Sequence, residues 1–234
     1  MRRAQSISWR FAESIDQLPL VALFVRDTLR LEVPAGGVIP PRLEGEVPDH
    51  SSLLAPVRRD AAGTGWTGWW QEVLARAGRL HLHHPGTRAA GLDLVAWARQ
   101  MAVEHRELDA AYPPVFDPPE FAGLADRPAL RQAVRVTFGE ALRWADTQRR
   151  SLLFLPARPA QFDSQLVPAE AEQTAGLHRV DLGQVRACAV VVPVLGAWWH
   201  RFAPGAVVCS VHAARDPAVA HTIITDAFES GLAT

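Results

Sequence analysis

The stretch ACAVVVPVLGAWWHRFAPGAVVCSVHA, residues 187–213, carries the clearest β-sheet pattern in the chain. Residues 187–194 form a nearly continuous apolar run rich in β-branched side chains, which is typical of a strand covered on both faces. A second apolar run, 206–213, follows Pro204-Gly205, a pair that fits the central positions of a type II turn. The pattern therefore predicts a small C-terminal sheet with a hairpin near 187–213.

A two-residue hairpin at Pro204-Gly205 predicts which side chains share a face, because neighbouring residues of a strand point to opposite sides. The predicted core-facing set comprises Trp198, Phe202, Val207 and Val211, and it would support a C-terminal helix. The predicted outer set comprises Trp199, Arg201, Ser210 and His212, which we expect to face solvent or a protein partner. His200 would face Cys209, although a thiol turned toward an apolar core is usually inert.

Helical periodicity dominates the first two-thirds of the chain. The clearest helix covers 65–77, where one stripe with i, i+3, i+4 spacing carries Trp66, Trp69, Trp70, Val73, Leu74 and Ala77. We expect these tryptophans to pack in the core rather than to line a partner groove, and Gly78 to follow the helix end.

Further helices are predicted from caps and periodicity. They begin at Ser14 or Asp16, cover 89–111, run from Asp126 and Pro128 to about 150, and cover 216–231. In the last of these, Asp216 is the expected N-cap and Pro217 the first helical residue. A short strand is expected at 151–156. Together, the predicted helices and strands indicate an α+β fold in one domain, 1–234, with Pro-rich joints at 34–48, 113–119 and 156–168.

Composition excludes several classes of protein. The formal net charge is −1 and no basic cluster occurs, so we expect no nucleic-acid partner. We also expect no signal peptide and no membrane span. Both cysteines, Cys188 and Cys209, lie in apolar runs, which indicates buried thiols and a cytoplasmic location.

Every basic residue other than histidine is arginine, and the chain has neither lysine nor asparagine. This bias is the expected product of a high-GC bacterial genome. It also excludes Schiff-base enzymes, the phosphate-binding loop and protein-kinase chemistry, all of which need a lysine.

Histidines provide the candidate catalytic or metal-binding groups. In an extended segment, His81 and His83 would share a face and could bind one zinc ion, but a third ligand is not evident. His105 and Asp109 could form a hydrogen-bonded pair on a helix. Ser51 or Ser52 is expected to cap a short helix.

These observations predict a non-enzymatic interaction or assembly protein of a high-GC bacterium, without a cofactor. It would bind a protein partner, or a second copy of itself, through tryptophan and arginine side chains. The alternative is a metal-dependent hydrolase with zinc at His81 and His83.

Overall fold

The computed structural model describes residues 9–34, 36–83, 103, 117–153 and 161–232. In these residues one four-stranded sheet has the strand order β1-β2-β4-β3. The strands are β1 (Arg10–Ser14), β2 (Arg186–Val192), β3 (Trp199–Ala203) and β4 (Ala206–Ser210). β1 and β4 run parallel to β2, and β3 runs antiparallel to β4.

Helices make up most of the described structure, as expected for the α+β class, which is confirmed. The α-helices are α1 (Gln17–Thr28), α2 (Pro56–His83), α4 (Pro128–Leu153), α5 (Leu166–His178), α6 (Val211–Arg215) and α7 (Pro217–Leu232). Short 3-10 turns cover Ser51–Leu53, Ala122–Leu124 and Leu182–Gln184. None of the helices among these residues is long and apolar enough to cross a membrane.

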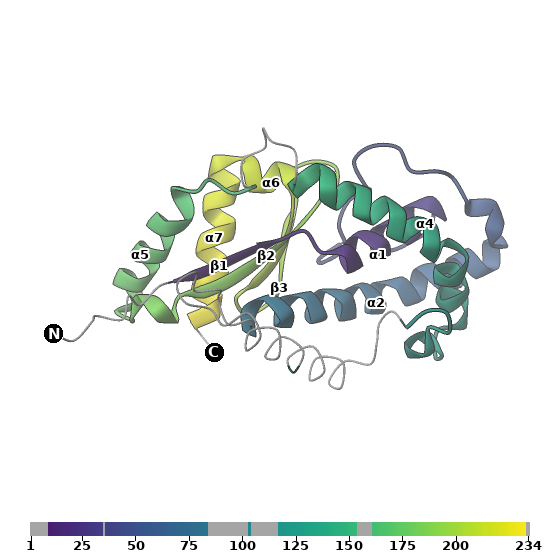
Figure 1. Cartoon of the computed structure of the whole chain (residues 1–234), viewed down its shortest axis with the longest axis horizontal. Coiled ribbons are helices and arrows are strands. Elements are labelled where there is room, and N and C mark those ends of the chain that lie inside the picture. The colour runs from purple at the N-terminus through teal and green to yellow at the C-terminus, as the bar shows by residue number, and fades with distance from the viewer. Residues whose placement is uncertain (1–8, 35, 84–102, 104–116, 154–160, 233–234) are drawn as a thin grey trace.

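The sheet lies between helices, with α7 on one face and α2 on the other (Figure 1). On the α7 side, the ring of Phe11 in β1 packs edge-on against Phe228, with 5.7 Å between centroids. Both β2 and β4 are buried from end to end, apart from Arg186. The prediction of a strand covered on both faces is therefore confirmed for β2.

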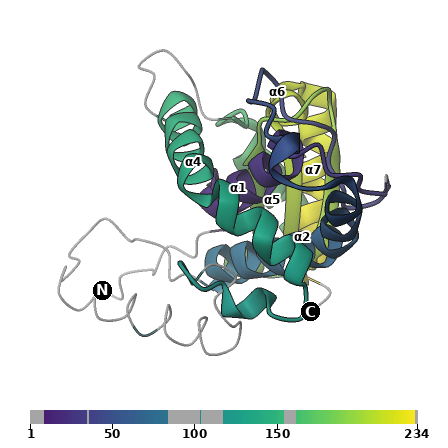
Figure 2. The ribbon, with the colours of Figure 1, turned by 90° about the vertical axis from the view of Figure 1, so that its right-hand side faces the viewer.

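Helix α1 packs between α2 and α4, beyond the end of the sheet (Figures 1 and 2). Its buried segment runs from Pro19 to Thr28. From Leu18 to Val25 the sequence is apolar on every side, which agrees with this burial and is typical of a helix enclosed by others.

The C-terminal helix forms as predicted. Asp216 Oδ1 accepts hydrogen bonds from the backbone N–H groups of Ala218 and Val219 at 3.0 and 3.2 Å, so it caps α7. The buried face is the predicted one: Ala220, Ile223, Ile224, Ala227 and Phe228. Gly231 does not end the helix, which continues to Leu232.

The tryptophan stripe of α2 is also confirmed as core, since Trp66, Trp69 and Trp70 are fully buried. The predicted end at Gly78 is wrong, because α2 continues to His83. Gly78 lies under the Phe202 ring, and a Cβ at this position would be 2.7 Å from Phe202 Cε2. The glycine is thus explained by close packing on β3 rather than by a helix end.

Other boundaries differ from the predictions or cannot be compared. The α4 prediction is confirmed, but the strand expected at 151–156 is wrong in its first half, because Ser151–Leu153 form the last turn of α4. Residues 154–156, and the predicted helix 89–111 except Val103, lie outside the described residues. β1 and α5 were not predicted.

Candidate functional site

The β3–β4 hairpin forms around Pro204-Gly205, but its predicted register is wrong by one residue. The observed pairs are Trp199 with Cys209, His200 with Val208, and Arg201 with Val207. The ladder is irregular between Arg201 and Ala203, so Phe202 is an extra residue on β3. A bulge of this kind shifts every pair beyond it, and turn geometry alone does not reveal it.

The predicted faces of β3 are inverted as well. Arg201 Nη1 lies 3.0 Å from Asp226 Oδ1 of α7, so Arg201 faces the C-terminal helix. The Phe202 ring faces Gly78 of α2 instead. By alternation along the strand, Trp199 belongs to the α7 side and His200 to the α2 side. Trp198 and Phe202 therefore do not supply the floor beneath α7 that the sequence predicted.

Ser210 is not part of an outer surface, because it is fully buried. Its Oγ accepts hydrogen bonds from the backbone N–H groups of Ala213 and Trp198, at 3.0 and 3.1 Å. Ser210 thus caps α6 and holds the start of β3. Its expected place in an interface is wrong.

His212 lies beyond the end of β4, in α6, and is exposed. Its Nε2 is 3.1 Å from Glu44 Oε1. Of the four residues predicted for the outer set, the structure places only Trp199 and Arg201 together on one strand.

The β3 strand is an edge of the sheet formed by the described residues. The Trp198 carbonyl accepts a hydrogen bond from Ser210 N at 2.8 Å, so Trp198 and, two residues on, His200 turn their backbone groups toward β4. Trp199 and Arg201 then turn theirs away from β4. Along this edge Trp199 is half-buried and the Arg201 side chain is 50% exposed. The edge can accept hydrogen bonds from another strand and donate to it.

Two hollows border β3, and both are lined in part by residues of the segment 33–42. One, of about 480 Å³, is lined by Val38, Gln71, Ala75, His200, Arg201 and Phe202. The other, of about 410 Å³, is lined by Trp198 and Arg42 together with Arg26, Val33, Gly36, Gly37, Ile39, Pro40 and Pro41. Both combine aromatic or aliphatic side chains with a few polar ones, which is the composition of a contact surface.

The thiols lack the surroundings of a nucleophile. Burial, with the nearby Asp16 carboxylate, raises the pKa of Cys188 to about 12. Burial also raises the pKa of Cys209, with a smaller effect from Glu13. Cys209 pairs with Trp199 rather than with His200, so the expected facing of His200 and Cys209 is wrong.

The proposed metal pair is not arranged as expected, because both His81 and His83 belong to α2 rather than to an extended segment. Residues i and i+2 of a helix lie about 200° apart and do not converge on one ion. His81 Nε2 instead lies 2.8 Å from Asp16 Oδ2, while Ser14 Oγ donates to Asp16 Oδ1 at 2.7 Å. In the described part of the chain, no three histidine, cysteine or acidic side chains form a candidate metal site. His105 and Asp109 lie outside it.

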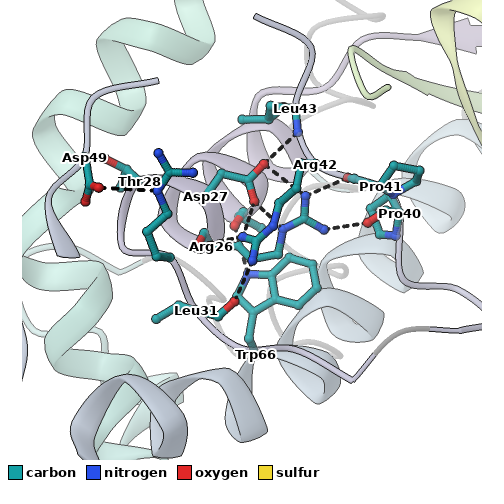
Figure 3. Close-up of polar contacts among 12 residues, drawn as sticks. Arg26, Asp27, Thr28, Leu31, Pro40, Pro41, Arg42, Leu43, Asp49 and Trp66 are labelled. Carbon is teal, nitrogen blue, oxygen red and sulfur yellow. Dashed lines mark hydrogen bonds and ion pairs between the residues drawn. The ribbon is translucent and has the colours of Figure 1, made fainter. Parts of the chain in front are cut away.

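A buried ion-pair network was not predicted from the sequence (Figure 3). Arg26 and Asp27 of α1 are 2% and 3% exposed. Arg26 Nε donates to Asp27 Oδ1 at 2.6 Å, and its two terminal nitrogens donate to the Pro40 and Pro41 carbonyls, each at 2.7 Å. Asp27 also accepts from Arg42 Nη1 at 2.8 Å and Leu43 N at 2.6 Å.

This network fixes the loop 40–43 against α1. The Arg26 guanidinium lies 5.2 Å from the centroid of the Trp66 ring, so it connects the loop to the tryptophan cluster of α2. The sequence did offer one signal for this network. The charged pair Arg26-Asp27 directly follows the apolar run 20–25 and comes shortly before Leu29. Because the Arg26 donors end on Asp27 and on main-chain carbonyls, we assign the network a structural role.

Comparison with protein-family models, with curated protein sequences and with solved structures found no match to this chain. The site must therefore be judged on its own geometry.

Proposed function

We propose that this protein is a non-enzymatic interaction or assembly protein of a high-GC bacterium, acting in the cytoplasm. It binds a protein through the edge of β3, with Trp199 and Arg201 as the central side chains. The observation that carries the proposal is that β3 is an edge strand of the sheet formed by the described residues and bears a half-buried Trp199 and an exposed Arg201, with two hollows bordering the strand.

The physical basis is strand addition. An extended peptide that pairs with a free sheet edge gains main-chain hydrogen bonds, and neighbouring pockets for its side chains supply specificity. Tryptophan and arginine are also the residues most often found at the energetic centre of protein interfaces. The β3 edge combines both features within five residues.

The test compares Trp199→Ala and Arg201→Ala with Leu177→Ala, a control on α5 where the leucine is 67% exposed. Capture of host proteins by the immobilised full chain is quantified together with thermal melting. We expect all three variants to melt within several degrees of the unchanged protein, since substitutions at exposed or partly buried positions cost about 1 kcal/mol or less. Capture should fall about 10-fold or more for Trp199→Ala and Arg201→Ala only, as for residues at an interface centre. Equal capture by all three variants contradicts the proposal.

The alternative is a metal-dependent hydrolase at His81 and His83. Elemental analysis after dialysis distinguishes the two functions. We expect well under one equivalent of zinc or another transition metal per chain. Stoichiometric metal that disappears in a His81→Ala, His83→Ala double variant would favour the hydrolase.

A further inference from the structure

We infer that the protein bound at the β3 edge is a second copy of this chain, paired antiparallel about a two-fold axis that passes between the two His200 residues. This inference rests on the proposed function and specifies its partner. The two four-stranded sheets would become one continuous sheet, an isologous dimer.

The backbone of β3 limits the possible registers. In an antiparallel pair, residues whose N–H and C=O groups point outward must face residues that also point outward. For two identical strands related by a two-fold axis, one residue therefore always faces itself. The bulge at Phe202 ends the regular edge. A two-fold pairing that uses both outward-pointing residues, Trp199 and Arg201, is centred on His200, and the nearest alternative is centred on Arg201.

Side-chain chemistry selects between these two centres. Centring on Arg201 places two guanidinium groups directly opposite each other, and like charges in facing positions destabilise a strand pair. Centring on His200 places Trp199 opposite Arg201 of the second copy, and this cation–π pair occurs twice by symmetry. The same register brings Trp198 close to Phe202 of the second copy, again twice, on the α2 side of the joined sheet.

The surroundings of the edge fit the same register. His200 and Phe202 lie on the α2 side of the sheet, where they border the hollow formed with Val38, Gln71 and Ala75. Trp198 of the second copy comes close to Phe202, which lines this hollow, so the register brings a large aromatic side chain toward an unfilled space. The net charge of −1 means that little long-range repulsion opposes association of two copies.

Sedimentation velocity of the full chain over a range of concentrations provides the first test. We expect a monomer–dimer equilibrium that Arg201→Pro abolishes, because proline removes an outward N–H without removing a hydrogen bond to β4. The matched control is Asp226→Asn, which breaks the ion pair of Arg201 but leaves the edge intact, and its dimer should be unchanged. Trp199→Ala should weaken the dimer about 10-fold, since two symmetric cation–π contacts are lost.

Cysteine trapping provides the second test and reports the register. In the His200-centred pair the two His200 residues are a non-hydrogen-bonded pair, about 4.5 Å apart at Cα, which is within the range for a disulfide. Under mild oxidation with diamide, His200→Cys should therefore form a disulfide-linked dimer, while Arg201→Cys alone should not. The native thiols are buried and should not contribute.

The outcomes separate this inference from the proposed function. A dimer that Arg201→Pro abolishes, with trapping at position 200, supports the inference. Trapping at position 201 instead of 200 overturns the register. A monomer at every concentration, with no trapping, overturns self-association. In that case, loss of host-protein capture in Trp199→Ala and Arg201→Ala would still support the proposed function, and unchanged capture would refute both.

Discussion

The tryptophans of α2 and those of β3 lie in opposite environments, although both groups are closely spaced in the sequence. Trp66, Trp69 and Trp70 are fully buried, and the rings of Trp66 and Trp70 stack with 5.4 Å between centroids. Trp198 and Trp199 are both half-buried.

The secondary structure explains the difference. Helical spacing places residues i, i+3 and i+4 on one face, so three bulky rings are buried together. Strand geometry sends neighbouring residues to opposite faces, so an adjacent pair cannot share one core. Position in the sheet adds to the effect, because β3 is an edge strand in the described structure while α2 is packed between the sheet, α1 and α4.

The largest predicted effect tests this contrast directly. Trp69→Ala should cost about 3–5 kcal/mol of unfolding free energy, because it leaves a cavity in a closed core. Trp199→Ala should cost about 1 kcal/mol or less, since the side chain is only partly buried. Chemical denaturation of both variants measures the difference. Similar losses for the two would remove the distinction between a core cluster and an interaction edge.

A similar effect is expected when the ion pairs of the two regions are compared. Asp27→Asn should cost about 3–5 kcal/mol, because it leaves the buried Arg26 charge without its counter-ion and places an amide against hydrogen-bond donors. The matched change near β3, Asp226→Asn, removes a pair whose arginine is half exposed and should cost about 0–1 kcal/mol. Urea unfolding of both variants provides the measurement. Equal costs would mean that the Arg26–Asp27 network does not stabilise loop 40–43 as described.

The smallest effect concerns the contact between the two regions, where Gly78 of α2 meets Phe202 of β3. Alanine usually stabilises a helix interior by about 1 kcal/mol relative to glycine. Here the added Cβ meets the Phe202 ring, so Gly78→Ala should fail to stabilise and should lower stability by about 1 kcal/mol.

A double-mutant cycle isolates this contact. In a Phe202→Ala background, Gly78→Ala should recover the ordinary gain, which gives a coupling of about 1–2 kcal/mol between the two positions. Additive effects would show that the ring does not restrict position 78.

The sequence determined the features that depend on local pattern. The helix stripe of α2, the cap and buried face of α7, the doubly covered strand β2 and the α+β class were all predictable, because each follows from the periodicity or capping of consecutive residues. β1 was missed because RFAES, residues 10–14, is short and weakly apolar, and becomes a strand by pairing with β2 far along the chain.

Tertiary structure alone decided the candidate site. The extra residue Phe202 shifts the hairpin register, and a shift of one residue exchanges the two faces of a strand, so Arg201 meets α7 and Phe202 meets α2. From the sequence alone, Ser210 was predicted to be a polar surface residue. In the structure α6 begins at the next position, and the Ser210 hydroxyl caps it. Arg26 and Asp27 lie in an apolar helix whose ion pair is satisfied by a loop about 15 residues away along the chain. Local pattern cannot specify such contacts, because their energies depend on which distant groups the fold brings within hydrogen-bond distance.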